Sequence, residues 1–224
     1  MELTENTLQI LKNFSAINSN IVIREGNTVQ TIAEAKNLLA KAEVAERFSQ
    51  DFGVYDLSEF LGVLGLVDQP QLEFSNEYVT IADSTGRSKV KYFFADPDML
   101  TTVSKEVKFP GADIKLTLDN TTLGRIKRAA AALGHNELVI TPDGDGTAML
   151  TVTTSDNSTS NTYSISVPVE STESIYKLVF NISNIKILAG DYDVEISSKL
   201  ISKFTNSANS MQYWIALEKT STYG

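Results

Sequence analysis

The residues best suited to chemistry in this sequence are three cations within four positions: Arg125, Lys127 and Arg128. They lie in the segment 120–134, NTTLGRIKRAAAALG, which holds no acidic residue. The formal charge of the whole chain is −9, so a purely cationic segment runs against the composition. Lys and Arg side chains bind the phosphates of nucleic acids without reading the bases. The segment therefore indicates either a solvated helix surface or a surface that meets a polyanion.

An α-helix is the element expected to carry these cations. Asn120 is a suitable N-cap and Gly134 a suitable stop, with an alanine run between them. At 100° per residue, Arg128 falls opposite the apolar face, Arg125 beside it and Lys127 on the flank. The apolar residues that share one face are Leu123, Ile126, Ala130 and Leu133. The spacing predicts an amphipathic helix with a basic outer surface.

Composition limits the classes of protein that fit. The chain has 224 residues, 42% of them hydrophobic, which is enough for one large domain or two of about 110 residues. It contains no cysteine, which excludes disulfides and thiolate chemistry. No segment approaches the roughly 20 apolar residues that span a bilayer, and residues 1–10 lack the pattern of a secretion signal. We therefore expect a cytoplasmic protein with no membrane partner and no cofactor.

Hydrophobic periodicity predicts a mixture of helices and strands along the whole chain. Further helices are expected at 3–17, 56–67 and 181–188. Strands are expected at 21–23, 52–55, 71–74, 78–82, 88–94, 114–118, 137–141, 147–153, 163–169, 192–196 and 211–217. Residues 33–46 fit a strand or a helix. Residues 95–111 show neither period and predict a connector between domains.

An internal repeat supports two similar domains. The stretch Val54-Tyr55-Asp56-Leu57-Ser58-Glu59-Phe60 aligns with Val179-Phe180-Asn181-Ile182-Ser183-Asn184-Ile185, and Gly65 then aligns with Gly190. Each copy reads as a strand end, an Asx cap, a short helix and a glycine stop. Repeated order of this kind indicates two copies of one unit. We predict an α+β fold in which domain 1 spans 1–94, a connector spans 95–111 and domain 2 spans 112–224, each domain placing two helices against antiparallel sheet.

The predicted helices together form a basic surface. Lys12 and Lys186 add to Arg125, Lys127 and Arg128, whereas Glu5 and Glu59 oppose them. Helices pack about 8–10 Å apart, so twelve side by side would close a ring of roughly 35 Å diameter, wide enough for duplex DNA. Four helices per chain would then require three chains. The five cations are the predicted DNA-facing residues.

Short motifs in a fixed order over the full length resemble the sliding DNA clamps of myovirus-type tailed bacteriophages. The matching motifs are Leu11-Lys12-Asn13-Phe14, Ile17-Asn18-Ser19, Val54-Tyr55-Asp56-Leu57, Phe60-Leu61-Gly62, Ile81-Ala82-Asp83, Ala95-Asp96-Pro97, Gly190-Asp191-Tyr192 and Ala216-Leu217-Glu218. The resemblance implies a DNA-clamp fold that assembles into a closed homotrimeric ring. It also implies that the ring encircles double-stranded DNA without sequence preference and tethers the replicative DNA polymerase. A clamp-loader ATPase and late-transcription factors are the further partners it implies, all within the host cytoplasm.

A docking pocket for these partners is harder to locate. Hydrophobic tails would need an apolar surface, which the connector and the last strand could supply. The candidate residues are Leu100, Val103, Phe109, Pro110 and Trp214. The alternative is that they pack between domains.

Two further sequence features and two other functions compete with the clamp interpretation. His135, the only histidine, follows a helix stop and is expected to be a turn residue. The 143–146 segment, DGDG, fits a hairpin turn better than a calcium loop, and no metal site is expected. A β-rich oligomeric phage structural protein would not need a basic helix. A carboxylate-dependent hydrolase would need a cleft with two perturbed acids, and we expect no enzyme.

Overall fold

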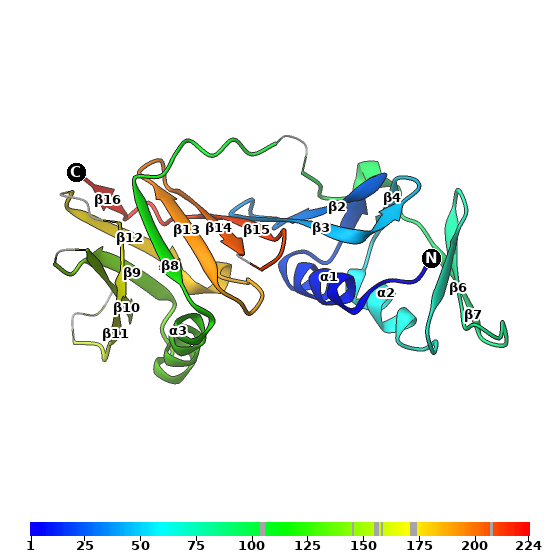
Figure 1. Ribbon diagram of the computed structural model, residues 1–224, viewed down its shortest axis with the longest axis horizontal. Helices are drawn as coiled ribbons and strands as arrows, with labels where there is room; N and C mark the ends of the chain where they lie inside the picture. Colours follow the sequence, from blue (N-terminus) through cyan, green and yellow to red (C-terminus); the bar gives the residue numbers. More distant parts are fainter. Residues whose placement is uncertain (104–105, 145, 155–156, 158, 171–173, 207) are drawn as a thin grey trace. The chain divides into compact units, whose positions relative to one another are not determined.

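The computed structural model describes residues 1–103, 106–144, 146–154, 157, 159–170, 174–206 and 208–224 (Figure 1). The chain divides into two compact units, Met1–Glu106 and Val107–Gly224. Parts of the predicted connector (104–105) and of the predicted hairpin turn (145) lie outside the described residues.

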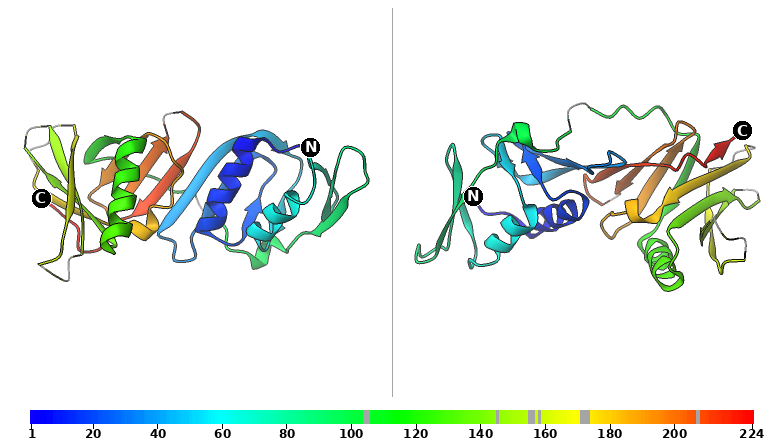
Figure 2. Two further views of the ribbon diagram at one scale, coloured as in Figure 1. Left: turned by 90° about the horizontal axis from the view of Figure 1, so that it is seen from below. Right: turned by 180° about the vertical axis from the view of Figure 1, so that it is seen from behind.

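Unit 1 places two helices against antiparallel strands. Its elements are α1 (Glu5–Ile17), β1 (Ile21–Ile23), β2 (Gly26–Ile32), β3 (Leu38–Phe48), β4 (Phe52–Val54), α2 (Leu57–Leu64), β5 (Gln71–Phe74), β6 (Tyr78–Ala82), β7 (Lys89–Phe93) and a 3₁₀ turn, η1 (Pro97–Met99). β1 pairs with β4, β2 with β3, and β5, β6 and β7 form a three-stranded sheet. The left view of Figure 2 shows α1 and α2 in front of the strands of this unit.

Side chains cap the N-terminal ends of both helices, and Asp56 is the Asx cap that the repeat predicts. The Thr4 side chain accepts a hydrogen bond from the Thr7 amide at the start of α1, and Asp56 accepts one from Glu59 at the start of α2. The faces that α1 and α2 turn inward carry Leu11, Phe14 and Phe60, each at most 2% exposed. The helix alternative for 33–46 is wrong, because β3 occupies most of this segment and alternates buried and exposed residues.

Unit 2 also packs strands with helix, but its described part has more strands than unit 1 and a single α-helix. Its elements are β8 (Ile114–Leu118), α3 (Asn120–Leu133), β9 (Glu137–Pro142), β10 (Thr147–Thr153), β11 (Tyr163–Pro168), β12 (Tyr176–Asn181), a 3₁₀ turn, η2 (Ile182–Asn184), β13 (Tyr192–Ser197), β14 (Ile201–Asn206), β15 (Gln212–Ala216) and β16 (Thr222–Tyr223). One sheet has the order β11-β10-β9-β12-β16, and β15-β14-β13-β8 are neighbours in another. Between them lies a core that includes Tyr192, Tyr213 and Phe180, none more than 1% exposed.

Two predictions about helices in unit 2 need correction. The N-cap of α3 is Asp119, whose side chain accepts from the Thr122 amide, and Asn120 is the first helical residue. The helix expected at 181–188 is only the single turn η2. Ile185 and Ile187 are both buried while Lys186 between them is exposed, so the stretch after η2 is not helical. The chain therefore has three α-helices in its described part, and the count of four that supported three chains does not hold.

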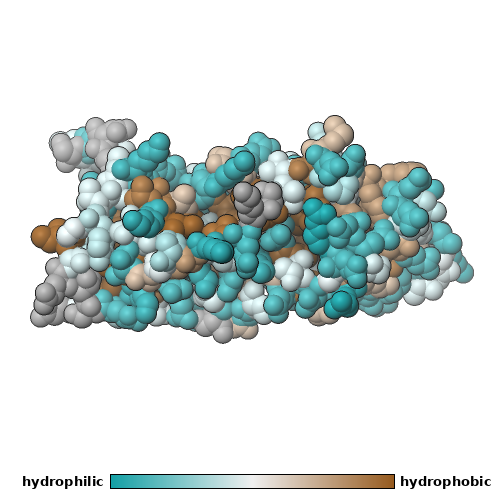
Figure 3. Space-filling model, turned by 90° about the horizontal axis from the view of Figure 1, so that it is seen from above, coloured by the Kyte–Doolittle hydropathy of each residue, from teal (hydrophilic) through white to brown (hydrophobic). Residues whose placement is uncertain are grey.

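Hydrophilic residues cover much of the visible surface of the protein (Figure 3). Figure 3 shows a face covered mostly by hydrophilic residues, with apolar surface between them. Among the large apolar side chains that stay exposed are Leu66, Phe93 and Met99, which are 74%, 61% and 85% exposed. No helix of the described chain is both long and apolar enough to cross a membrane.

Candidate nucleic-acid interface

The helix α3 presents two of its three cations to solvent. Arg125 and Arg128 are exposed, whereas Leu123 and Ile126 on the opposite side are 2% and 1% exposed. Neither arginine belongs to an ion pair within the described part of the chain. A guanidinium that no carboxylate neutralises remains available to an external phosphate. The predicted basic outer surface is therefore present on this helix.

Arg128 lies back along the helix over Gly124. A Cβ added at Gly124 would come within 3.2 Å of the Arg128 Nη1 atom. The glycine leaves room for the guanidinium to lie against the helix one turn earlier. At the N-terminal end of α3, the hydrogen bond from the Thr122 amide is the main cause that lowers the pKa of the Asp119 carboxyl, and the charge of Arg125 adds a smaller effect in the same direction.

Lys127 is placed differently from the two arginines. Its Nζ atom donates a hydrogen bond of 3.1 Å to the backbone carbonyl oxygen of Ile187, and the side chain is half-buried. Burial lowers the pKa of this ammonium group. Lys127 thus connects α3 to the stretch after η2, and this contact could not be predicted from helical spacing alone.

The remaining predicted cations, Lys12 on α1 and Lys186 after η2, are both exposed. The acids that accompany the helices are Glu5 and Glu59, also exposed, and Glu59 lies 3.5 Å from the Tyr92 hydroxyl of β7. Burial, aided by the nearby Glu59 and Asp56, raises the pKa of Tyr92 to about 12. The helix surface of unit 1 is therefore mixed in sign, while that of α3 is basic.

The start of α1 is anchored by a residue that sequence analysis missed. Glu46 of β3 is 8% exposed, and its carboxylate accepts hydrogen bonds from the Thr4 amide and the Thr7 hydroxyl. Burial would raise the pKa of Glu46, but hydrogen bonds, chiefly those from Thr7 and Thr4, together outweigh burial and lower the pKa. A signal was present in the sequence, because Val44, Glu46 and Phe48 alternate onto one buried face.

The start of α3 is anchored at the surface instead. The Asp191 carboxylate accepts a hydrogen bond of 2.7 Å from the Asn120 amide, and the Asn120 side chain accepts one of 3.0 Å from the Gly190 amide. These residues link α3 to the segment before β13. Both helices that carry candidate DNA contacts therefore have fixed N-terminal ends.

The five candidate docking residues do not share one environment. Leu100 is 8% exposed and packs in unit 1, where a Cβ on Gly53 would lie 2.8 Å from its Cδ1 atom. Val103 also belongs to unit 1, whereas Phe109, Pro110 and Trp214 belong to unit 2. The Trp214 Nε1 atom is buried and has no hydrogen-bond partner in the described part of the chain. The role of these five residues remains a prediction.

The backbone amide and the side chain of His135 both make hydrogen bonds close to the end of α3. The His135 amide donates to the carbonyl of Ala130, and its ring Nε2 lies 2.7 Å from the carbonyl oxygen of Asn161, where it acts as donor. His135 follows Gly134, which ends α3 in the left-handed conformation with φ of 67°. No cluster of potential metal ligands occurs among the described residues, although Asp145 of the 143–146 turn is outside them.

Comparison with known proteins places this arrangement in a family. Residues 4–101 match the family described as DNA polymerase processivity factor, and residues 115–219 match the family described as gp45 sliding clamp, C terminal. The sliding clamp of Vibrio phage KVP40 is 31% identical over 224 residues, which cover 97% of this chain and 99% of that protein. The chain belongs to the sliding-clamp family. The sliding clamp of Escherichia phage RB69 is 29% identical over 100% of this chain and 99% of its own length.

Solved clamp structures share the fold of this chain. Proliferating Cellular Nuclear Antigen from Entamoeba histolytica matches with a TM-score of 0.67 at 15% identity, covering 95% of this chain and 94% of that one. The PCNA2-PCNA3 complex from Sulfolobus tokodaii matches with a TM-score of 0.64 at 15% identity, covering 95% of both chains. The expected α+β clamp fold is confirmed. As a sliding clamp, the protein is a processivity factor for DNA polymerase and not an enzyme.

Proposed function

We propose that three copies of this chain close into a ring around duplex DNA. The observation that carries this proposal is the basic face of α3 in a clamp-family chain of net charge −9. Arg125 and Arg128 would face the phosphates, with Lys12 and Lys186 as further contacts and Lys127 as a residue that positions α3. Contacts to phosphates alone attract DNA without reading its sequence and allow the ring to slide.

Open strand edges support closure between copies. β7 ends the three-stranded sheet of unit 1, where Phe93 is 61% exposed, whereas the far edge, β5, is covered by Met1 through hydrogen bonds to Leu72. In unit 2, β11 is the outer strand of its sheet. An open edge can pair with a strand of another chain. Pairing of β7 with β11 of the next copy would be heterologous, and such contacts form rings when the rotation closes.

The partners in this proposal follow from the family. The ring would tether the replicative DNA polymerase, would be loaded by an ATPase complex and would serve late-transcription factors in the host cytoplasm. Apolar tails of these partners would dock at Leu100, Val103, Phe109, Pro110 or Trp214. A β-rich structural role is the weaker alternative, because it leaves the exposed arginines of α3 without a use.

Retention on DNA tests the proposal directly. The loaded protein should stay on a nicked circle and leave it when the circle is linearised, and light scattering should give the mass of three chains. Replacing Arg125 and Arg128 with Glu should reduce processive synthesis about tenfold or more without changing this mass, because like charges then face the phosphates. Replacing Lys177, an exposed residue of β12, with Glu is the matched control. Equal loss from circular and linear DNA, or a strict monomer, would contradict the ring.

A further inference from the structure

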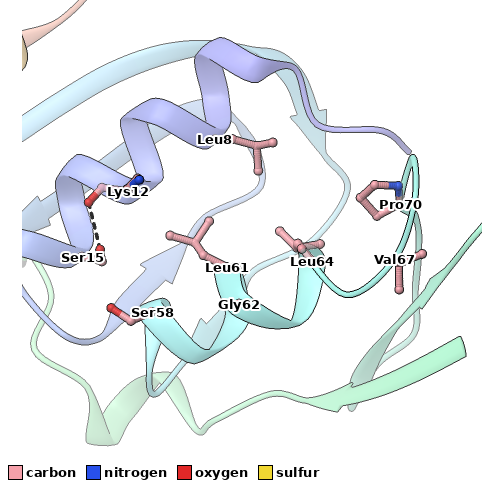
Figure 4. Close-up of a pocket in the computed structure, with 10 residues that line it drawn as sticks. Leu8, Lys12, Ser15, Ser58, Leu61, Gly62, Leu64, Val67 and Pro70 are labelled. Atoms are coloured by element: carbon pink, nitrogen blue, oxygen red, sulfur yellow. Dashed lines mark hydrogen bonds between the residues drawn. The ribbon is translucent and has the colours of Figure 1, made fainter.

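A groove between α1 and α2 of unit 1 has no assigned role. It has a volume of about 570 Å³ and is lined by Leu8, Lys12, Ser15, Ser58, Leu61, Gly62, Leu64, Gly65, Val67 and Pro70. This volume lies within the range of roughly 300–1,000 Å³ that small-molecule sites occupy. Figure 4 shows that the polar residues gather at one end and that Val67 and Pro70 lie at the other. The groove is therefore amphipathic along its length.

The polar end offers a positive charge. Lys12 is exposed, and its ammonium group makes no hydrogen bond or ion pair with any described residue. Ser58 is also exposed, and its hydroxyl can donate, whereas the Ser15 hydroxyl already donates to the Lys12 carbonyl at 2.9 Å. One ammonium and one free hydroxyl at the same end of the groove suit a single carboxylate.

Between its two ends the groove offers a hydrocarbon surface with few backbone partners. Leu61 and Leu64 belong to α2, and the interior N–H and C=O groups of α1 and α2 are hydrogen-bonded within each helix. An extended peptide would bring its own amides against Leu61 and Leu64 and leave them unsatisfied, which is costly. A hydrocarbon chain carries no such groups.

A glycine keeps the groove open. Gly62 lies inside α2, where alanine would favour the helix. A Cβ at this position would meet no atom within 4 Å, so the space beside it is empty groove. A larger side chain here would fill the groove without displacing the core.

We propose that this groove binds a small amphipathic carboxylate, of the medium-chain fatty-acid class. The carboxylate would bind Lys12 and Ser58, and the chain would lie against Leu61, Leu64 and Val67. Binding at this site does not require the ring. Because Lys12 is also a proposed DNA contact, the bound anion would neutralise one cation of the DNA-facing surface.

Titration of the full-length protein with decanoate, below its micelle concentration, tests the proposal by calorimetry and by amide chemical shifts of α1 and α2. We expect one saturable site per chain, with affinity rising about fourfold for each buried methylene from hexanoate to decanoate. Gly62→Leu should abolish binding. The matched control Gly62→Ala should retain it, as should Leu66→Gln, which changes an exposed residue outside the groove.

The charge requirement has its own controls. Decanol should bind at least tenfold more weakly than decanoate, and Lys12→Gln should remove that difference. Absence of saturable decanoate binding, or binding that survives Gly62→Leu, would overturn the proposal. Equal affinity for decanol and decanoate would overturn the role of Lys12. None of these results depends on DNA retention or on the number of chains, so the ring and the groove can fail separately.

Discussion

The two units have different helices, although a short stretch of sequence is repeated in both of them. In unit 1, Asp56 caps α2 through the Glu59 amide at 2.9 Å, and the helix continues for 8 residues. In unit 2, Asn181 caps η2 through the Ser183 amide at 3.0 Å, and the turn ends after 3 residues. The same cap thus starts a helix in one unit and a single turn in the other. A cap sets where a helix begins, whereas the residues that follow decide whether it continues.

The residues after each cap explain the difference. In α2, Leu57, Phe60 and Leu64 are buried at helical spacing. After η2, Ile185 and Ile187 are buried two positions apart, which is the spacing of an extended chain. Unit 1 consequently has a second helix and a groove beside it. In unit 2 the Lys127 ammonium donates instead to the Ile187 carbonyl in the stretch after η2.

The largest difference in stability between the two units is expected when the residues that hold the N-terminal ends of α1 and α3 are replaced. Glu46→Ala removes a buried carboxylate that holds the Thr4 amide and the Thr7 hydroxyl, and should reduce the free energy of unfolding by about 2–3 kcal/mol. Asp191→Ala removes an exposed acceptor and should cost less, because water can replace it. Urea denaturation of both variants measures the difference. Equal losses would mean that burial of the anchor is unimportant.

The Glu46 carboxylate should also make the stability of the folded protein depend on pH. The pKa of Glu46 in the folded state lies below its ordinary value of 4.5. Its stabilising contribution is therefore complete above pH 4.5 and is lost as the pH falls through the folded-state pKa. Glu46→Gln, which keeps one acceptor oxygen but cannot titrate, should flatten the stability curve below pH 4.5 relative to the native chain. A curve of unchanged steepness would assign acid sensitivity to other carboxyls.

A smaller loss of stability is expected when Lys127 of α3 or Lys12 of α1 is replaced. Lys127→Met should lower the free energy of unfolding by about 1–2 kcal/mol, because the Ile187 carbonyl loses its donor. Lys12→Met should leave stability nearly unchanged, since its ammonium has no partner in the described chain. For retention on DNA we expect the reverse order, with the larger loss at Lys12. Denaturation and retention measured on both variants would separate positioning from contact.

The caps should give the smallest effect. Asp56→Ala should reduce stability by about 1 kcal/mol, because an eight-residue helix loses its N-cap. Asn181→Ala should cost less, because η2 has fewer backbone groups to align. Helix content measured by far-ultraviolet circular dichroism should fall only in the first variant. A loss of helix signal in the second would show that η2 supports α3.

Much of the fold could be predicted from sequence, and the exceptions have physical reasons. Hydrophobic periodicity identified β8 and β13, and the Asx cap at Asp56 marked the start of α2. Asn120 was mistaken for the cap of α3 because Asp119 beside it caps equally well. The site was predicted only in part. Helical spacing gave the exposure of Arg125 and Arg128, whereas the burial of Lys127 depends on Ile187, 60 residues further along the chain.

Gly53 limits where unit 1 of this clamp can be joined to unit 2 of a related clamp. A Cβ at this position would lie 2.5 Å from the backbone oxygen of Ala95, whose amide donates to the Gly53 carbonyl at 2.9 Å. A side chain here would collide with backbone, which cannot rotate away, so a selection from a randomised library should return only glycine. A chimera that joins unit 1 of this clamp to unit 2 of a relative should therefore keep residues 95–100 with unit 1, and its crossover belongs after Leu100.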